Sequence, residues 1–330
     1  MFAQGNTRLI ARCAAIAAVC GLVTFAAADA ARSQAWPSRP VTVVVPFTPG
    51  TAVDISARVV MDQVSRQVGQ PFVIENRGGA GSTLGTNVVA KAAPDGHTIL
   101  VSGSMASAHA IYSNLPYDTL RDFTAVVSLG LQPLVLVTAP DKSFKTLPEL
   151  IKAAKAGTLT YASAGVGSAT HLAVERFRIS AGFEAQHVPF RGAPEGLREV
   201  MAGRVDFYAV PVPPALALIK DGKLVALAIS GTKRIGVLPD VPTTTELGHA
   251  DSAYFLYGGV YVHAKTERAV VLKMHQEIEK ALAAPAVRER LQKLGAEPMP
   301  MSQEAFDKYF RADVEGNIKL VKTAKIPMQQ

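Results

Sequence analysis

Two short stretches of the sequence combine glycines with hydroxyl side chains directly before an expected helix. The first is Pro46–Asp54 and the second is Tyr161–His171. Backbone N–H groups at a helix start have no partner within the helix and carry a partial positive charge, and glycines let a bound anion approach them closely. Because the two stretches are more than a hundred residues apart, we expect them on two lobes that hold one negatively charged ligand.

Each stretch follows an expected strand. Val41–Pro46 is a β-branched run typical of a buried parallel strand, and Leu159–Ser163 precedes the second stretch. Both turns should lie at the carboxyl ends of strands, the edge at which open α/β sheets bind ligands. Further strands are expected at Phe72–Glu75, Thr98–Ser102, Leu131–Thr138, Ala185–Pro189, Val205–Val210, Leu224–Ser230 and Tyr254–Val262, and helices at Thr83–Ala92, Ala169–Ala181, Pro194–Ala202, Ala269–Ala283, Ala286–Leu294 and Ser302–Lys322. The helix behind the first strand should end at Gly69, and a capping box at Thr146–Glu149 should begin a helix that stops at Gly157.

This alternation of strands and helices predicts an α/β fold with right-handed crossovers, and the length predicts two lobes, each with a mostly parallel sheet flanked by helices. Ala139-Pro140 is the expected crossing into the second lobe, and the strand near 255 is the expected return. The first lobe is then discontinuous, 36–139 plus 255–330, and the second is 140–254. Two crossings suit hinge closure around a ligand.

The first 35 residues have the order of a secretory signal peptide. Two arginines precede the apolar run Cys13–Ala28, and small residues allow cleavage after Ala30 or Ala35. An uncleaved membrane anchor is the alternative, although the run is short for a membrane span. Both cysteines of the chain lie in this leader, so we expect an exported, periplasmic mature protein without disulfides or thiol chemistry.

Charge and histidine spacing exclude several classes of function. The net charge of +7 falls to +5 once the leader is removed, and no run of Lys or Arg stands out, which argues against nucleic-acid binding. The seven histidines are scattered without a ligand-pair spacing, so we expect no metal site. We also expect no cofactor.

Two patterns in the second stretch could indicate catalysis or nucleotide binding. Gly165–Thr170 approaches the dinucleotide fingerprint, but the following strand ends at His187–Arg191 without the acidic residue that would hold a ribose. Ser168, His171 and Glu175 have helical spacings that resemble a nucleophile, a base and a carboxylate. Hydrolase triads usually gather from separate elements, whereas this set is local, so a hydrolase stays the less favoured alternative.

Short motifs follow one another in a defined order along the chain: Trp36–Pro40, Val45–Phe47, Pro49-Gly50 with Asp54, Glu75–Arg77, Gly79–Gly81, Pro94–Gly96, Leu115–Asp118, Asp122-Phe123, Tyr161–Ser163, Gly165–His171, His187–Gly192, Gly203–Asp206, Gly222–Leu224 and Leu238–Thr243. Over roughly 36–326 this series resembles that of the Bug-type periplasmic solute-binding proteins of tripartite tricarboxylate transporters. Three places depart from the family pattern: Thr51 replaces a usual glycine, Tyr257 a usual tryptophan, and His263–Glu267 a Pro/Gly-rich segment near the second crossing.

The resemblance implies a two-lobed type II binding-protein fold that holds carboxylates through backbone amides, hydroxyls and bridging water. It also implies a membrane permease as partner, with a sensing role as the alternative. We expect a monomer that binds a small organic carboxylate, with dicarboxylates, amino acids and aromatic acids all open. The expected ligand-binding residues are Phe47, Thr48, Gly50, Thr51, Asp54, Gly81, Ser82 and Ser102 from the first lobe, and Ser163, Gly165, Gly167, Ser168, Thr170 and Arg191 from the second.

Overall fold

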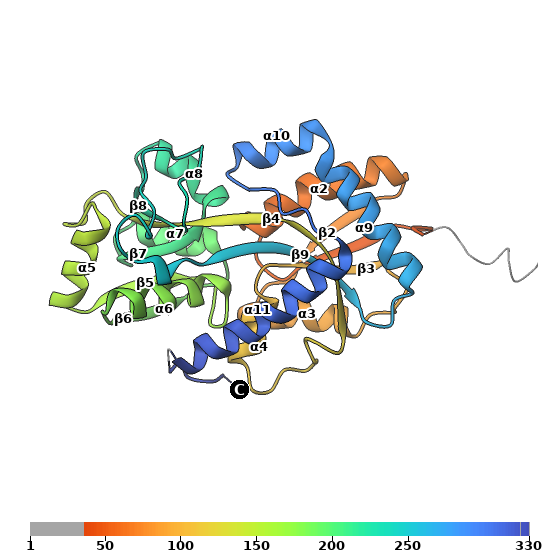
Figure 1. The fold of residues 1–330 in the computed structure, drawn as a ribbon, viewed down its shortest axis with the longest axis horizontal. Helices are drawn as coiled ribbons and strands as arrows, with labels where there is room; N and C mark the ends of the chain where they lie inside the picture. Colours follow the sequence, from red (N-terminus) through yellow and green to blue (C-terminus); the bar gives the residue numbers. More distant parts are fainter. Residues whose placement is uncertain (1–35, 324, 330) are drawn as a thin grey trace, which may run out of the picture. The chain divides into compact units, whose positions relative to one another are not determined.

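Two long strands connect the two lobes of this chain. The computed structural model describes residues 36–323 and 325–329, and the account below concerns the unit Arg39–Gln330. Strand β4 (Phe123–Thr138) pairs with β9 (Phe255–His263) up to Pro133, and from Leu134 onward it pairs with strands of the second lobe. The two strands run from one lobe into the other (Figure 1).

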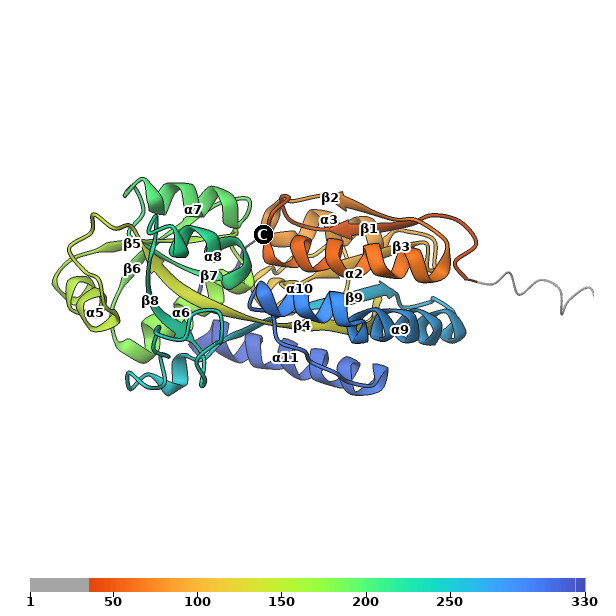
Figure 2. The same ribbon diagram turned by 90° about the horizontal axis from the view of Figure 1, so that it is seen from above.

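The first lobe is built on the sheet order β2-β1-β3-β9-β4. Strand β1 is parallel to both β2 and β3, whereas β9 is antiparallel to β3 and β4. Helices α9 and α11 lie against β4 (Figure 2). The elements are β1 (Val41–Val45), α2 (Ala52–Val68), β2 (Phe72–Asn76), the 3₁₀ turn η1 (Ala80–Ser82), α3 (Thr83–Ala90), β3 (Thr98–Ser102), α4 (Met105–Ile111), α9 (Arg268–Ala283), α10 (Pro285–Lys293) and α11 (Gln303–Thr323).

The second lobe continues the same sheet with the order β4-β7-β5-β6, and β8 pairs with the other edge of β4. The pairs β5–β6 and β5–β7 are parallel, as expected, while β4 is antiparallel to both β7 and β8. The elements are α5 (Leu147–Ala156), β5 (Leu159–Ser163), α6 (Ala169–Ala181), β6 (Ala185–Pro189), α7 (Ala193–Met201), β7 (Phe207–Pro211), α8 (Val212–Lys220), β8 (Val225–Ser230) and η2 (Ala250–Ser252).

The two-lobed α/β fold is therefore confirmed, with a sheet that is more mixed than the strand–helix alternation indicated. The antiparallel pairings all involve the connecting strands β4 and β9. Strand β4 begins at Phe123, well before the expected Leu131. Its register shifts between Ser128 and Leu131, where Gly130 adopts φ +116°. Such a bulge breaks the regular alternation of side chains by which a strand is recognised.

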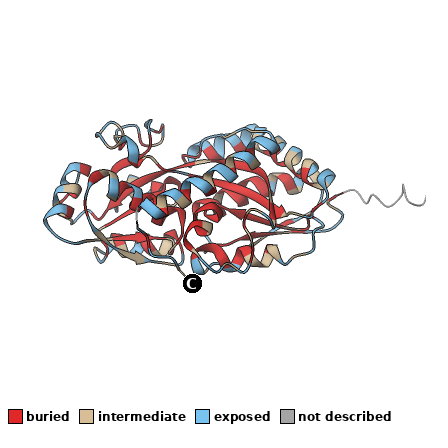
Figure 3. Cartoon of the chain, turned by 60° about the horizontal axis from the view of Figure 1, so that its bottom comes forward, coloured by how far each residue is buried: buried red, intermediate tan, exposed pale blue. Residues whose placement is uncertain are grey.

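Local helix signals behave as the sequence indicates. Thr146 and Glu149 form a capping box at the start of α5, which ends at Gly157. Gly69 closes α2 in the left-handed conformation, with φ 70°. Buried residues fill the interior of both lobes, including most of the strands (Figure 3). No helix of the described residues is both long and apolar enough to cross a membrane, and the expected leader lies outside those residues.

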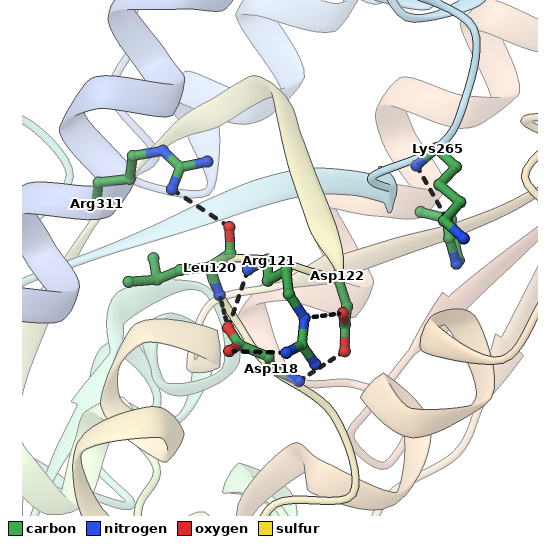
Figure 4. A network of polar contacts seen from close by, with 7 residues as sticks. Asp118, Leu120, Arg121, Asp122, Lys265 and Arg311 are labelled. Carbon is green, nitrogen blue, oxygen red and sulfur yellow. Dashed lines mark hydrogen bonds and ion pairs between the residues drawn. The ribbon is translucent and has the colours of Figure 1, made fainter.

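A polar network fixes the turn that leads into β4 (Figure 4). Asp118 Oδ1 accepts the backbone N–H groups of Leu120 and Arg121, and Asp122 accepts the N–H of Asp118. Arg311 of α11 donates to the Leu120 carbonyl, at 3.3 Å. The two aspartates at the ends of the motifs Leu115–Asp118 and Asp122-Phe123 thus have a structural role in this turn.

One expectation about the family departures is wrong. His263 pairs with Phe123 at the first residue of β4 and accepts the N–H of Lys265 at 3.0 Å. The segment His263–Glu267 therefore lies at the end of β9 that is farthest from the connection between the lobes. The expected strand Tyr254–Val262 agrees with β9 to within one residue, but a strand of this length carries the chain well away from the crossing near 255 before it reaches His263.

Candidate ligand-binding cleft

The first turns of α2 and α6 line one small cavity between the lobes. Its volume is about 30 Å³, which is room for one or two waters. We call it the inner cavity. Its walls are Phe47, Thr51, Ala52, Val53, Gly103, Ser104, Ala164, Ser168, Ala169, Thr170, Ala193, Pro211 and Leu256.

Both helices start with a hydroxyl N-cap at this cavity. Thr51 and Ser168 have extended backbone conformations, and their hydroxyls accept the N–H of Asp54 at 3.4 Å and of His171 at 3.3 Å. A cap hydroxyl satisfies one N–H of the first turn and leaves others directed toward the space in front of the helix. Two helix starts thus direct donors and partial positive charge at the same cavity.

Asp54 supports the first turn from behind and does not line the cavity. Its carboxylate accepts Gly50 N–H at 2.9 Å, Asn76 Nδ2 at 2.9 Å and Arg58 Nε at 3.1 Å. Burial alone would raise the pKa of Asp54, but the hydrogen bonds from these three residues outweigh it and lower the pKa below its usual value. Asn76 also donates to the Phe47 carbonyl, at 3.0 Å. The carboxylate is therefore already saturated with donors.

The second turn is held by side chains of its own lobe. Ser163 Oγ accepts the Gly165 N–H at 3.0 Å and lies 2.6 Å from His187 Nε2. His171 Nδ1 accepts the Gly167 N–H at 3.3 Å. The Thr170 hydroxyl accepts the N–H of Ala164 at 2.9 Å. The shape of this turn is thus fixed before any ligand arrives.

The two lobes touch around the inner cavity. Ser104, at the start of α4, accepts the Ala169 N–H across the cleft at 3.0 Å. Tyr112 donates its hydroxyl proton to the Val166 carbonyl at 3.2 Å. Gly81 packs against the same carbonyl so closely that a Cβ atom on it would overlap the oxygen. The described arrangement is therefore a closed one.

A wider groove of about 420 Å³ continues from the inner cavity, and Phe47 and Ala164 line both. We call it the outer groove. Ala80 and Ser82 border it with positive φ angles of 44° and 93°, on either side of Gly81. In residues other than glycine such conformations cost of order 1–3 kcal/mol each and concentrate at ligand sites. The remaining walls are Gly79, Tyr112, Gly165, Val166, Pro189, Phe190, Arg191, Glu195 and Gln329.

Two hydroxyls at the cleft have no hydrogen-bond partner among the described residues. Thr48 Oγ1 and Ser82 Oγ are both out of contact with solvent, and Thr48 lies against Gly192 of the opposite lobe. A buried hydroxyl without a partner is unfavourable by roughly 1–3 kcal/mol. Both are therefore available to a bound polar group.

The expected site residues divide into three groups. Lining the inner cavity or the outer groove are Phe47, Thr51, Gly81, Ser82, Gly165, Ser168, Thr170 and Arg191. Beside the interface between the lobes are Thr48, Gly50 and Gly167, which approach Gly192, Pro194 and Tyr112. Behind the turns, with side chains bonded within their own lobe, are Asp54, Ser102 and Ser163.

Sequence reasoning missed Ser104 and Tyr112. Ser104 follows Ser102-Gly103 at the end of β3, so it repeats the glycine and hydroxyl pattern of the two main turns and could have been found by it. Tyr112 follows the short helix α4 without any such signal. Its role depends on the second lobe, which only the folded chain brings into contact.

The possible hydrolase relay is not assembled. Ser168 Oγ bonds the backbone N–H of His171 and lies 3.1 Å from Thr170 Oγ1, while the His171 ring accepts Gly167 N–H. Glu175 accepts the Tyr161 hydroxyl at 2.7 Å and pairs with Arg178. A nucleophile activated by a base that a carboxylate orients requires a different set of contacts.

A second cavity of about 280 Å³ lies in the first lobe, away from the cleft. Its walls are mostly apolar side chains of α9, α10 and the segment Ala296–Pro300, with Glu279 and Arg288 among them. All of them belong to one lobe, so closure of the lobes does not form this cavity. Within the described residues, no group of three or more His, Cys, Asp or Glu side chains is placed to hold a metal ion.

Comparison with known proteins now identifies the family. The family model described as "Tripartite tricarboxylate transporter family receptor" matches residues 56–326. The chain belongs to this family. Its relatives include the "UPF0065 protein in tcbD-tcbE intergenic region" of Pseudomonas sp. (strain P51), 37% identical over 94% of both chains. Protein BugT of Bordetella pertussis is 34% identical over 89% of this chain and 90% of its own.

Solved structures of the family share the fold. "R. palustris Rpa4515 with adipate" superposes with a TM-score of 0.85 at 30% identity and covers 89% of this chain and 100% of its own. "MatC (Rpa3494) from Rhodopseudomonas palustris with bound malate" has a TM-score of 0.82 at 32% identity and covers 87% and 100%. The periplasmic binding protein BugD has a TM-score of 0.83 at 30% identity and covers 89% and 100%. The chain is thus a solute-binding protein of the tripartite tricarboxylate transporter receptor family.

Proposed function

We propose that this protein captures a small organic carboxylate between its lobes in the periplasm and presents it to a membrane permease. The observation that carries the proposal is the pair of helix starts that line one inner cavity, in whose described walls there is no Lys or Arg. Adipate and malate are the acids named for two relatives of similar fold, which supports a carboxylate ligand.

In this proposal the carboxylate of the ligand enters the inner cavity and the rest of the molecule extends past Phe47 into the outer groove. Each helix start contributes roughly 0.3–1 kcal/mol to an exposed anion, and more once closure removes water. The unpartnered hydroxyls of Thr48 and Ser82 supply further donors. Because these groups recognise the acid head, the identity of the remainder depends on the outer groove.

The proposed periplasmic location is supported by the family and by the N-terminal sequence. Relatives of this fold are periplasmic binding proteins, and the first 35 residues have the order of a signal peptide. We propose lobe boundaries at 36–139 with 255–330, and at 140–254, with the last five residues of β4, Leu134–Thr138, already paired with strands of the second lobe. The protein acts as a monomer without cofactor, metal or catalysis.

A thermal-shift screen tests the proposal. We expect one or more acids of a panel of adipate, malate, glutamate and benzoate to raise the melting temperature, because a ligand that binds only the folded state stabilises it by about 2.7 kcal/mol at 100 times its Kd. For a protein of this size that corresponds to a rise of about 5 °C. The diamide of the best acid is the matched control without charge. If none of the acids raised the melting temperature at millimolar concentration, the result would contradict the proposal.

Replacing the hydroxyl that caps α6 separates binding from stability. We expect Ser168→Ala to lower affinity for the best acid of the panel about tenfold and stability by about 1 kcal/mol, because a cap and a wall of the inner cavity are lost together. Thr146→Ala removes the equivalent cap of α5 outside the cleft and should lower stability alone. Calorimetric titration and melting curves measure the two effects. Equal affinity of both variants would remove Ser168 from the site.

A further inference from the structure

Two histidines are stacked directly behind the turn that lines the second lobe's side of the cleft. The rings of His171 and His187 have centroids 4.0 Å apart at an interplanar angle of 8°, and the Tyr161 ring stacks on His187 at 4.9 Å. His171 is only 4% exposed. The stack therefore lies between the core of the lobe and the Gly165–Ser168 turn.

Each imidazole bonds a different part of the turn. His171 Nδ1 accepts the Gly167 N–H at 3.3 Å, and His187 Nε2 lies 2.6 Å from the Ser163 hydroxyl, which in turn accepts Gly165 N–H. An N–H donor requires an unprotonated nitrogen as its acceptor, so His171 must be neutral with its proton on Nε2. A proton on Nδ1 would place two N–H groups against each other.

The surroundings keep both rings uncharged. Burial, with a smaller effect of the Arg178 charge, lowers the pKa of His171 to about 4, and burial together with His171 lowers the pKa of His187 to about 3. The ionisable groups around the stack are Tyr161 of β5, Glu175 and Arg178 of α6, Glu184 before β6, and Tyr112, which approaches Gly167 from the first lobe.

We propose that His171 is a positioning residue for the ligand site: as a neutral acceptor for Gly167 N–H, it gives the Gly165–Ser168 turn the shape that places Ser168 and Thr170 in the wall of the inner cavity. The inference rests on the proposed function, since it assigns a role within that ligand site. The affinity for the ligand should therefore depend more on the hydrogen-bond acceptor of His171 than on the apolar packing of its ring.

Two substitutions of opposite character separate these contributions. His171→Asn keeps an acceptor, because the Asn Oδ1 occupies the place of Nδ1, whereas His171→Leu keeps apolar volume and removes the acceptor. We expect His171→Asn to bind the best acid of the panel within about threefold of the parent protein, and His171→Leu to bind it at least tenfold more weakly. His249→Asn is the matched control, because His249 packs on Phe177 of the same helix away from the turn. A role in packing alone would instead leave the leucine variant the tighter binder, and that order would overturn the proposal.

A readout without any acid keeps this test separate from the proposed function. In ¹⁵N-glycine-labelled protein, the Gly167 amide resonance should keep its position from pH 7 to pH 5 and move as the pH is lowered through about 4, where the pKa of His171 lies. In His171→Asn the movement near pH 4 should be absent. A Gly167 resonance that moves identically in both proteins, or that titrates near pH 6.5, would overturn the role of His171 even if the acid panel succeeds.

Discussion

The Gly81→Ala variant is expected to bind its acid at least about 100-fold more weakly than the parent protein, equivalent to about 2.7 kcal/mol. A Cβ atom at this position would overlap the carbonyl oxygen of Val166 on the opposite lobe and crowd the Tyr112 hydroxyl. Because the obstacle is backbone, it cannot move aside as a side-chain tip would. The variant should therefore remain open and leave the cleft accessible to water.

A matched control removes the contribution of backbone strain. Gly81 and Gly69 both adopt left-handed conformations, with φ 59° and 70°, and a Cβ atom on Gly69 would meet nothing within 4 Å. Both alanine variants should lose about 1 kcal/mol of stability, and Gly69→Ala should keep its affinity. Calorimetric titration with the acid selected by thermal shift measures the difference. Equal affinities for the two variants would show that closure does not depend on this contact.

The second large effect is expected from Asp54→Ala, which should lower the free energy of unfolding by about 3 kcal/mol and abolish measurable binding. Removing a buried carboxylate leaves its donors without a partner, at a cost of about 3–5 kcal/mol, and we take the lower value because Arg58 is half exposed. Without the carboxylate, the Gly50 N–H and the Asn76 amide no longer fix the turn before α2. The midpoint of urea unfolding measures the loss.

The chain supplies a control for this variant on the same helix. Asp62 pairs with Arg66 at the same i,i+4 spacing, but both side chains are more than half exposed, so Asp62→Ala should cost less than about 0.5 kcal/mol. The pH dependence gives a further check. Since the pKa of Asp54 is lowered in the folded state, its stabilising contribution is present above pH 3.8 and is lost as the pH falls through the lower, folded value. Equal losses for the two variants would mean that Asp54 does not hold the turn.

Local patterns in the sequence were sufficient to predict the two turns and most of the alternation of elements, although the short helices α4 and α8 were not expected. The glycines and hydroxyls before α2 and α6 shape and cap the backbone of their own segment. The residues next to one another in the sequence are therefore enough to predict each turn. The capping box at Thr146 and the C-cap at Gly69 were predictable for the same reason. The mixed sheet could not be predicted in the same way. The bulge near Gly130 interrupts the side-chain alternation of β4, so its first half was not recognised as a strand.

The roles of individual side chains at the cleft depend on contacts between distant segments. Asp54 is of a type and in a place that suggest a ligand contact. In the folded chain, however, Asn76 and Arg58 donate hydrogen bonds to its carboxylate from the side away from the cleft. Ser104 and Tyr112 take part only because the second lobe meets them across the cleft. The glycine and hydroxyl pattern marks Ser104 as part of a turn, but no pattern within either segment encodes which residues of the other lobe it meets. That is set by how β4 and β9 join the lobes.

A crystal structure of the protein with the acid that gives the largest thermal shift tests the central claim most directly. The account predicts that a carboxylate of the ligand lies between the first turns of α2 and α6, within hydrogen-bond distance of backbone N–H groups of both, with no Lys or Arg side chain paired to it. A ligand in the first-lobe cavity beside Glu279, or one whose carboxylate in the cleft is held chiefly by Arg191, would contradict it.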